Sequence, residues 1–418
     1  MKILVIGGGG REHAIAWKIK QSKKVIKLYI TPGNGGTSLV GTNLGISNSK
    51  EIVNWLKKNK MDLVVVGPDS YLASGIVDKI SKLGIPVFGP TKKASEIEWS
   101  KSFAKRLMKN EGIPTATSKT FSNFEKAKKY LNTQKFPIVI KADGLAFGKG
   151  VVIAKNIIEA KNTLKNTLLN KKFGLAGRKI LIEEYLEGRE ISIHAFCDGN
   201  TSVLFPSSQD HKRIFDGDIG PNTGGMGVIS PVPNIDQGLL NEIKNKIVDP
   251  CLFGLKRIGK PFVGVLYPGI IITKDGPKVI EFNARFGDPE AQVYMRTLET
   301  ELIGILVACT RQKLNKVNIK WSKKSACCVV LVSKGYPNKY KINKEVSGIE
   351  KIKDKNVVVF HAGTNKVDND FVTSGGRVFG VTYVSKKLDE SIKKAYKNLK
   401  HINFEGMQYR TDIGRRKQ

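Results

Sequence analysis

Three polar residues, Glu281, Asn283 and Arg285, are spaced two apart within an otherwise apolar run. Because successive side chains of a β-strand point to opposite faces, this spacing predicts that all three lie on one face. Carboxylate and amide oxygens suit Mg²⁺, and a guanidinium group offers a planar pair of donors to a phosphate or a carboxylate. The pattern indicates a metal and phosphate site, with a strand of solvated polar residues as the simpler alternative.

The residues that follow argue against this simpler alternative. Residues 286–290 add a glycine turn and two more carboxylates, Asp288 and Glu290, at the carboxyl end of the expected strand, where ligands tend to gather.

The apolar residues of the same run predict how the strand is buried. Val279 lies two residues before Glu281, so we expect it to point the same way. The other apolar side chains should point into a core: Ile280, Phe282 and Ala284.

A glycine loop, residues 7–10, lies between an expected strand at 3–6 and an expected helix at 12–20. Backbone N–H groups and the helix dipole favour an anion at such a junction. The loop is not a dinucleotide fingerprint, because Glu12 replaces its third glycine and the second strand ends without an acid that would bind a ribose. Two more loops, 32–37 and 66–69, follow the next strands, so we expect three loops at one crevice.

A second glycine-rich loop joins two expected strands at 137–141 and 151–154. It differs from a Walker A loop in its spacing and because a strand follows it in place of a helix. Lys141 on the first strand and Lys149 on the loop could still both reach phosphate oxygens.

Two further segments are candidates for binding. Residues 180–190 form an apolar strand that becomes polar, whose backbone could bind an adenine edge and whose Glu190 could accept ribose hydroxyls, although a solvated acidic turn is nearly as compatible. Residues 220–227 form a glycine-rich loop typical of lids and binding loops, with an exposed linker as the alternative.

Whole-chain patterns predict a multidomain α/β and α+β protein. Strands and helices alternate over residues 1–100, including helices at 12–20 and 50–57, which predicts an N-terminal doubly wound parallel sheet. We expect two central parts at 101–190 and 191–320, the first with a mobile lid at about 120–188. Residues 321–418 should form a small C-terminal α+β domain, with strands at 326–333, 357–361 and 376–383 and a helix at 388–400. In it His361 and Arg377 lie near strand ends, where a lone histidine is more often structural than catalytic.

Composition narrows the class of protein. The 418 residues carry a net charge of +33, but the lysines are spread along the chain without a basic block or interleaved aromatic residues, which disfavours a specific nucleic-acid partner. Five scattered cysteines indicate a reducing compartment, and the longest apolar runs are only strand-length. We expect a cytoplasmic protein without a signal peptide or a membrane partner.

The ordered motifs resemble those of the phosphoribosylamine-glycine ligase family of the ATP-grasp superfamily over essentially the whole chain. The motifs that carry this resemblance are GGREHA from Gly9, PGN from Pro32, KADGLAFGKGV from Lys141, SQDHKR from Ser208, GPNTGGMG from Gly220, IEFNARFGDPE from Ile280 and FHAGT from Phe360. The resemblance implies that the central domains have the ATP-grasp fold and that the protein acts in purine biosynthesis. It also implies a monomer whose partners are small-molecule substrates. It implies that glycine, ATP and 5-phosphoribosylamine yield glycinamide ribonucleotide, ADP and phosphate through glycyl phosphate.

The resemblance also implies residue roles. Mg²⁺ or Mn²⁺ would be held by Glu281 and Asn283, and Arg285, Lys149 and Asp288 would be catalytic. The ATP site would comprise Lys101, Lys141, Gly148, Lys149, Gly150, Glu183, Glu184, Tyr185, Leu186 and Glu190. The other substrates would bind Gly8, Gly9, Gly10, Arg11, Asn34, Asp69, Asp210, Lys212, Arg213, Asn222, Thr223, Arg285, Asp288 and Glu290.

Within this set, the phosphate of phosphoribosylamine is expected near residues 8–11. Glycine would be held by Arg285 at its carboxylate and by Asp288 or Asp210 at its ammonium group. The alternatives are another ATP-grasp carboxylate-amine ligase, a basic nucleic-acid-binding protein on the same scaffold, or a non-catalytic homologue.

Overall fold

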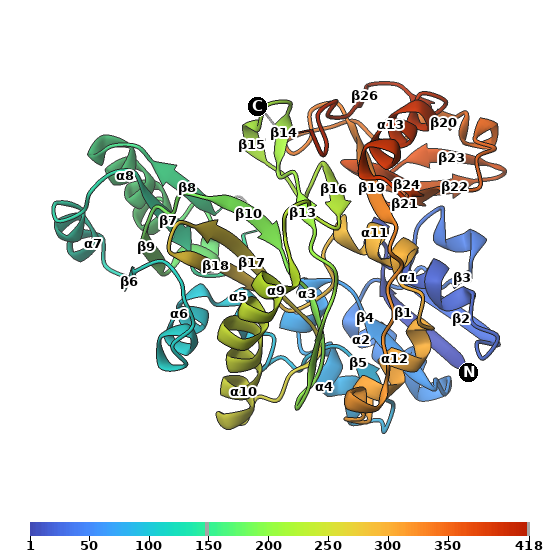
Figure 1. The fold of residues 1–418 in the computed structure, drawn as a ribbon, viewed down its shortest axis with the longest axis horizontal. Helices are drawn as coiled ribbons and strands as arrows, with labels where there is room; N and C mark the ends of the chain where they lie inside the picture. The colour runs from blue at the N-terminus through green and yellow to red at the C-terminus, as the bar shows by residue number, and fades with distance from the viewer. Residues whose placement is uncertain (147–149, 416–418) are drawn as a thin grey trace.

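A computed structural model describes residues 1–146 and 150–415 of the chain (Figure 1). Its N-terminal part is a parallel sheet with strand order β3-β2-β1-β4-β5, as the alternating pattern predicts. The strands are β1 (Lys2–Gly7), β2 (Lys27–Pro32), β3 (Thr42–Asn43), β4 (Leu63–Val66) and β5 (Val87–Phe88). The helices are α1 (Gly10–Lys20), α2 (Ser49–Lys58), α3 (Asp69–Ala73) and α4 (Ile76–Ser81).

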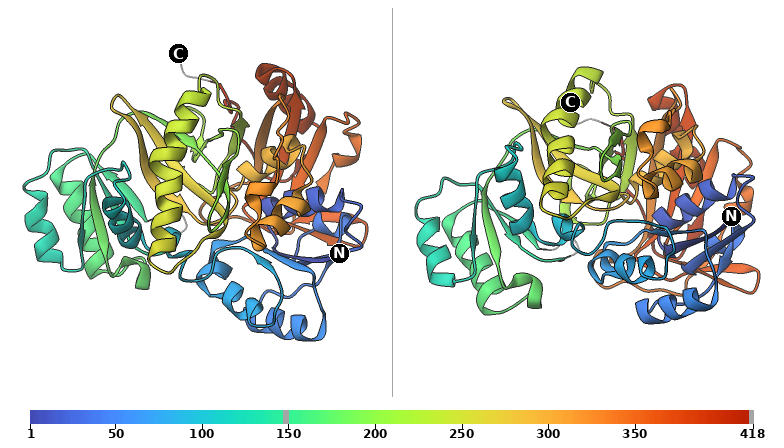
Figure 2. Two further views of the ribbon diagram at one scale, coloured as in Figure 1. Left: turned by 60° about the horizontal axis from the view of Figure 1, so that its bottom comes forward. Right: turned by 90° about the horizontal axis from the view of Figure 1, so that it is seen from below.

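The central strands of this sheet are buried on both faces. Ile3 and Val5 belong to one core, which they share with strands near the C-terminus, whereas Leu4 and Ile6 belong to a second core with α2 and α4. Continuous apolar runs are expected for parallel strands that are covered on both sides. The shared core packs the N-terminal sheet against the C-terminal part of the chain, as two further views show (Figure 2).

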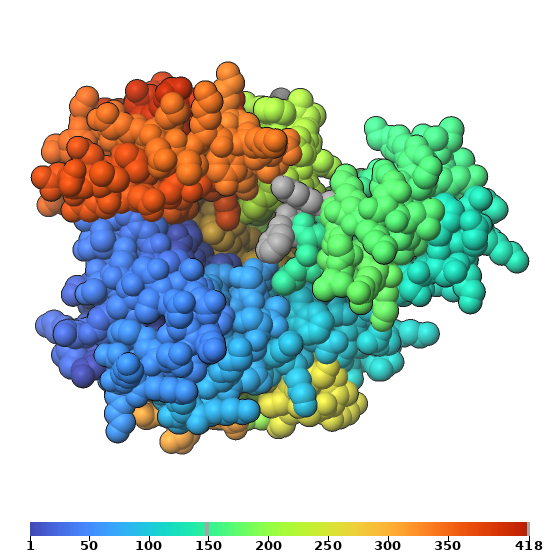
Figure 3. All heavy atoms as spheres, turned by 180° about the vertical axis from the view of Figure 1, so that it is seen from behind, coloured from blue at the N-terminus to red at the C-terminus, as the bar shows by residue number. Residues whose placement is uncertain are grey.

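The next part projects from the rest of the molecule (Figures 1 and 3). It is an antiparallel sheet of order β6-β9-β7-β8, covered by α7 (Phe124–Leu131) and α8 (Ile157–Leu164), with a core of its own. Its strands are β6 (Ser118–Phe121), β7 (Ile138–Ala142), β8 (Val151–Ala154) and β9 (Ile180–Glu184). Strands β7 and β8 pair antiparallel, so the predicted hairpin around the second glycine loop is present.

A second central sheet carries the predicted metal strand, β18 (Gly276–Asn283). Its long strand β17 (Val263–Thr273) pairs with β10 (Arg189–Ser192), β11 (Ala195–Asp198) and β18, and β12 (Ser202–Leu204) extends it beyond β11. Four helices complete this part of the fold: α5 (Glu96–Trp99), α6 (Lys101–Asn110), α9 (Gln237–Ile243) and α10 (Asp249–Arg257).

The last large sheet combines segments that are far apart in the sequence. Its order is β13-β16-β19-β24-β21, with β26 beside β19. The strands are β13 (Gln209–Asp210), β16 (Gly227–Ser230), β19 (Ser325–Ser333), β21 (Val357–His361), β24 (Arg377–Ser385) and β26 (Met407–Gln408). The motifs after residue 208 are therefore attached to the C-terminal sheet.

Smaller elements surround this sheet. Helix α13 (Leu388–Leu399) and helix α11 (Glu290–Thr297) pack on it, and α12 (Leu302–Thr310) follows α11. The remaining strands form a hairpin, β14 (Arg213–Phe215) with β15 (Ile219–Asn222), and a small sheet of β22 (Thr364–Val367), β23 (Asp370–Thr373), β20 (Glu345–Ser347) and β25 (Asn403–Phe404). Among the described residues, none of the helices has the length and apolar character needed to cross a membrane.

A β-bulge in β18 corrects one prediction. Gly269 pairs with Glu281 but the next residue, Ile270, pairs with Val279, so Ile280 is an extra residue in the strand. Val279 is consequently buried in the same core as Phe282 and does not share the face of Glu281, so that prediction is wrong. Ile280 is only half-buried, whereas Phe282 and Ala284 lie in the core as predicted.

Candidate functional site

Glu281 lies at the centre of a group of cations. Burial opposes the ionisation of this carboxyl group, but Lys212, Lys101 and Lys141, together with Arg285, outweigh burial and hold its pKa below the usual range. The strand, the start of α6, the β7 hairpin and the segment after β13 thus contribute to one electrostatic cluster. An ionised carboxylate among cations is suited to the opposite charges of a metal ion and a polyphosphate.

Asn283 and Arg285 are in direct contact, as expected for residues on one face. Arg285 Nη2 donates to Asn283 Oδ1 at 3.1 Å, and Asn283 Nδ2 donates to the carbonyl of Tyr267 at 3.4 Å. Among the described residues, no group of three or more histidines, cysteines or carboxylates could hold a metal ion. The oxygens of Glu281 and Asn283 suit Mg²⁺, which commonly takes one or two protein oxygens and completes its shell with phosphate and water.

Glu98, which the sequence interpretation missed, anchors Arg285. Its Oε1 lies 3.1 Å from Arg285 Nη2, and its Oε2 accepts the backbone N–H of Ala284 at 2.8 Å. Burial alone would lower the pKa of Arg285, but Glu98 and Asp69 raise it above its ordinary value. Within the described part of the chain, the buried Nε of Arg285 has no hydrogen-bond partner, which leaves it free to donate to a ligand.

Lys141 is held by a carboxylate and by the bulge. Its Nζ lies 2.9 Å from Glu183 Oε2 and donates to the carbonyl of Ile280 at 3.0 Å. The extra residue in β18 thus supplies an acceptor that ties the β7 hairpin to the metal strand.

Lys105 is a second residue that the sequence interpretation missed. Its Nζ lies 3.5 Å from Glu183 Oε2, and burial lowers its pKa to about 8, to which the neighbouring charge of Lys141 contributes while Glu183 opposes the shift. Lys105 follows Lys101 by four residues, so helical spacing was an available signal. The structure places two lysines on one buried carboxylate beside the candidate ATP residues.

The other predicted ATP residues occupy different environments. Glu183 is buried, whereas its neighbour Glu184 is exposed and accepts the N–H of Thr117 at 2.8 Å, as alternation along β9 requires. Tyr185 is exposed and Leu186 is half-buried. Of the predicted ATP residues in the glycine loop, Gly150 is described and its carbonyl accepts the N–H of Ala142, whereas Gly148 and Lys149 lie outside the described residues.

Lys212, a predicted substrate residue, contacts Glu190, a predicted ATP residue. Its Nζ lies 3.1 Å from Glu190 Oε2, and this carboxylate raises the pKa of Lys212 above its ordinary value. The predicted substrate motif after residue 208 is therefore adjacent to the predicted ribose-binding glutamate.

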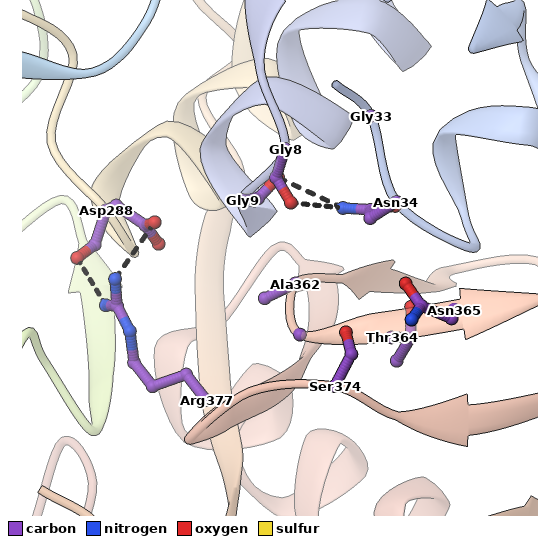
Figure 4. A pocket seen from close by; sticks show the side chains of 11 residues that line it. Gly8, Gly9, Gly33, Asn34, Asp288, Ala362, Thr364, Asn365, Ser374 and Arg377 are labelled. Carbon is purple, nitrogen blue, oxygen red and sulfur yellow. Dashed lines mark hydrogen bonds and ion pairs between the residues drawn. The ribbon is translucent and has the colours of Figure 1, made fainter. Parts of the chain in front are cut away.

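A second site is a pocket of about 350 Å³ between the N-terminal glycine loop and the C-terminal part (Figure 4). It is lined by Gly8, Gly9, Gly33, Asn34, Asp288, Ala362, Gly363, Thr364, Asn365, Ser374 and Arg377. The loop residues precede α1, so backbone N–H groups and the helix dipole favour an anion there. Of the three loops that we expected at one crevice, the loops 7–10 and 32–37 contribute residues to the lining of this pocket. The third loop, 66–69, does not, so the prediction of a three-loop crevice does not hold for this pocket.

Arg377 and Asp288 form one wall of this pocket. Arg377 Nη2 lies 3.0 Å from Asp288 Oδ2, and Nη1 donates to the carbonyl of Asp288 at 2.7 Å and to that of Gly224 at 2.5 Å. Burial would raise the pKa of Asp288, but Arg377 and Arg11 hold it below its usual range. The sequence interpretation noticed Arg377 beside Gly376 without assigning it a role.

Gly10 and Arg11 have positions different from those of Gly8 and Gly9. Neither lines the pocket; Arg11 is buried, lies 2.5 Å from Glu12 and donates to the carbonyl of Phe286 at 3.1 Å. Arg11 therefore ties α1 to the segment that follows the metal strand.

Asp210 and Glu290 lie in a buried polar cluster. Tyr267 Oη donates to Glu290 Oε1 at 2.8 Å, and burial together with the charge of Glu290 raises the pKa of Asp210. In the described structure Asp210 Oδ1 and His194 Nε2 are buried without hydrogen-bond partners. Such unpaired atoms are compatible with a ligand that carries its own donors.

The glycine-rich loop 220–227 is attached to the C-terminal part. The N–H of Gly224 donates to Tyr336 Oη at 2.9 Å, in addition to its carbonyl contact with Arg377. Thr223 Oγ1 donates to the carbonyl of Lys212, while Asn222 pairs with Arg213 across the hairpin. These contacts tie the loop to Arg377, which lines the pocket, although none of residues 220–227 lines it.

Family models match almost the whole chain. The model described as "Phosphoribosylglycinamide synthetase, N domain" matches residues 1–98, the ATP-grasp (A) domain matches 99–291, and the C domain matches 326–416. The chain belongs to the phosphoribosylglycinamide synthetase family. Its ATP-grasp segment carries the Glu281 cluster, and ATP-grasp enzymes use ATP and divalent metal ions.

Individual relatives cover the same extent. Phosphoribosylamine–glycine ligase of Caldanaerobacter subterraneus subsp. tengcongensis is 45% identical over 99% of this chain and 99% of its own length. The ligase of Halalkalibacterium halodurans is 46% identical over 99% of this chain and 96% of its own length. A crystal structure of phosphoribosylamine–glycine ligase from Thermotoga maritima has 32% identity and a TM-score of 0.88, covering 99% of this chain and all of that one. This phosphoribosylglycinamide synthetase chain therefore has the fold that its motifs predicted.

Proposed function

We propose that the chain is an ATP-dependent ligase that joins glycine to 5-phosphoribosylamine, giving glycinamide ribonucleotide, ADP and phosphate in purine biosynthesis. The observation that carries this proposal is the convergence of Lys101, Lys141 and Lys212 on the half-buried, ionised Glu281, beside Arg285. This cluster offers a phosphate-transfer site, and the pocket around Gly8 and Gly9 offers a separate site for a phosphorylated amine.

Glycine needs activation because a carboxylate is a poor acceptor for an amine. Phosphoryl transfer from ATP gives glycyl phosphate, and attack by the phosphoribosylamine nitrogen forms the amide bond and releases phosphate. Lys101 and Lys141 would neutralise phosphate charge, and Arg285 would stabilise the charge that develops on the transferred phosphoryl group.

Glu281 and Asn283 would hold the divalent ion, for which we propose Mg²⁺ or Mn²⁺. When bound, such an ion supplies positive charge to the phosphate oxygens. Glu183, Glu184, Tyr185, Leu186 and Glu190 would hold adenosine, and the glycine loop that contains Gly148, Lys149 and Gly150 would cover the phosphates.

We propose different roles for the carboxylates near the amine substrates. Asp288 lines the pocket while it pairs with Arg377, so we propose that it faces the phosphoribosylamine nitrogen and that the phosphate lies at the glycine loop. The buried cluster of Asp210 and Glu290 would hold the glycine ammonium group, whose carboxylate Arg285 would bind.

An acyl phosphate hydrolyses in water, so the site must close during turnover. We propose that the projecting part, about 120–188, is the lid, within the divisions 1–100, 101–190, 191–320 and 321–418. We further propose a cytoplasmic monomer whose partners are its small-molecule substrates. Light scattering after gel filtration tests the oligomeric state.

The first experiment measures ADP release by the purified chain with Mg²⁺-ATP, freshly generated phosphoribosylamine and glycine, omitting each in turn. We expect release only with all three, and a fall of roughly 100-fold or more in Glu281→Gln, because the variant loses the charge that binds the metal. Glu350→Gln, which changes an exposed carboxylate in the same way, is the matched control and should match wild type. Turnover without glycine would favour another carboxylate-amine ligase, and absence of turnover would favour a non-catalytic role.

A further inference from the structure

The pocket around Gly8 and Gly9, which we propose binds phosphoribosylamine, has walls from the two ends of the chain. These two ends meet at one residue, His361. The N–H of His361 donates to His13 Nδ1 at 2.9 Å. The carbonyl of His361 accepts from Asn34 Nδ2 at 2.9 Å, and the same amide group donates to the carbonyl of Gly8 at 2.9 Å. Two side chains of the N-terminal part therefore hold both backbone polar groups of a single residue in the C-terminal part.

The residues that follow His361 line the pocket. Ala362, Gly363 and Thr364 come directly after it and line the pocket, and Figure 4 shows Ala362 on the side of the pocket opposite the glycine loop. Thr364 is held from two sides: its carbonyl accepts the N–H of Gly35 at 2.8 Å, and its hydroxyl lies 3.0 Å from His361 Nδ1. The position of this turn relative to the glycine loop thus depends on His361.

The contact is buried and closely packed. His13, Asn34 and His361 are 4%, 6% and 2% exposed, and the two imidazole rings meet edge to face at 5.6 Å. A Cβ atom at Gly36 would overlap both rings, so the chain at that position has no room for a side chain. A buried N–H without an acceptor is costly, so loss of His13 Nδ1 would destabilise the position of His361.

His13 does not line the pocket, although Asn34 does. We propose that His13 is a positioning residue for the phosphoribosylamine site: by accepting the N–H of His361, it sets the distance between the Gly8–Gly9 turn and the Ala362–Thr364 turn. This inference rests on the proposed function and adds to it that the affinity for the phosphorylated amine, and not for ATP or glycine, depends on His13.

The test compares two substitutions in the full-length chain. His13→Leu removes the acceptor while keeping an apolar side chain, and His13→Asn keeps an acceptor oxygen near the position of Nδ1. We expect His13→Leu to raise the KM for phosphoribosylamine by roughly 5- to 100-fold, the range for loss of one buried hydrogen bond. The KM values for ATP and glycine should stay within about twofold, and His13→Asn should recover most of the loss.

Binding of ribose 5-phosphate, a stable phosphorylated probe, provides a readout that does not need turnover. Calorimetry should show weaker binding to His13→Leu than to wild type, and His401→Leu, at an exposed histidine, should bind like wild type. If His13→Leu does not fold, Gly36→Ala displaces the same contact from the opposite side and should give the same selective loss.

The outcomes separate the two proposals. A wild-type chain that fails to turn over the three substrates contradicts the proposed function. An active wild type whose folded His13→Leu variant keeps its KM for phosphoribosylamine, or loses affinity for all three substrates equally, contradicts the positioning role alone.

Discussion

At the scale of single residues, the site depends on charges whose partners come from distant segments. Arg285 contacts Glu98, and Lys141 contacts Glu183, so each of these two cations has a buried counter-charge. These pairs orient the cations before a ligand binds, which is the arrangement that electrostatic stabilisation of a transition state requires. Removing a counter-charge should therefore affect the reaction without removing the cation itself.

Glu98→Gln tests this at Arg285. The amide keeps the shape of Glu98 but not its charge, so we expect kcat to fall by about 10- to 100-fold. The KM for ATP should change less, because the lysines near Glu281 remain. Glu96→Gln, in the same helix α5 and paired with Lys260, is the control. Equal effects in the two variants would contradict an orienting role for Glu98.

At the scale of elements, irregular features connect the site. The bulge at Ile280 gives β18 an extra carbonyl, which accepts from Lys141, and the loop that follows the hairpin β14–β15 contacts Arg377 through the carbonyl of Gly224. That hairpin is held by the C-terminal segment: Arg410, only 1% exposed, lies 2.6 Å from Asp218 and 2.7 Å from Asp412. The C-terminal segment therefore supports a loop that precedes it by almost two hundred residues.

Arg410→Met should loosen this hairpin. The variant leaves the carbonyl of Arg213, which accepts from Arg410 at 3.1 Å, and two carboxylates without their donor. We expect a loss of about 1–3 kcal/mol in the free energy of unfolding, measured by urea denaturation. Hydrogen exchange should become faster over residues 213–222. Arg311→Met, at an exposed arginine, serves as the control. Unchanged exchange in the hairpin would show that Arg410 does not hold it.

At the scale of the whole molecule, the N-terminal and C-terminal parts share a core and meet at two buried histidines. Burial lowers the pKa of His13 to about 4, and burial together with His13 lowers the pKa of His361 to about 3. Both histidines are neutral at pH 7, as the hydrogen bond accepted by His13 Nδ1 requires. Their ordinary pKa in an unfolded chain is about 6.5.

The stability of the folded chain should therefore fall in acid. Below pH 6.5 the unfolded state binds more protons than the folded state, so the contribution of these histidines is complete above pH 6.5 and is lost as the pH falls toward about 4 for His13 and about 3 for His361. Each histidine should contribute a slope of up to about 1.4 kcal/mol per pH unit. Urea denaturation at several pH values measures it.

His13→Asn provides the comparison for this prediction. Its slope between pH 6.5 and 4 should be smaller than that of wild type, because one titrating group is gone, whereas His401→Asn should leave the slope unchanged. Identical slopes in wild type and His13→Asn would show that His13 does not control acid stability.

Local patterns in the sequence were sufficient for most of the elements. Strands β8 and β21 have the predicted bounds, Val151–Ala154 and Val357–His361, and the parallel N-terminal sheet follows from alternating strands and helices. Helix α1 begins at Gly10, two residues earlier than predicted, because the N–H of Gly9 is satisfied by Glu12 at 2.7 Å. The face of Glu281, Asn283 and Arg285 was also predictable, since strand alternation is a property of neighbouring residues.

The tertiary structure alone decided which partners complete the site. The bulge at Ile280 exists because β17 and β18 pair with a shift in register, which no pattern within β18 indicates. Glu98, Lys105 and Arg377 act on residues that lie far from them in the chain, and the contact of His13 with His361 spans 348 positions. Periodicity records which face a residue occupies, but it does not record which distant segment packs on that face. The types of residue in the site and the fold are therefore predictable from the sequence of this protein. The pairs of residues that fix the protonation of the site and the spacing of its walls form only when the chain is folded.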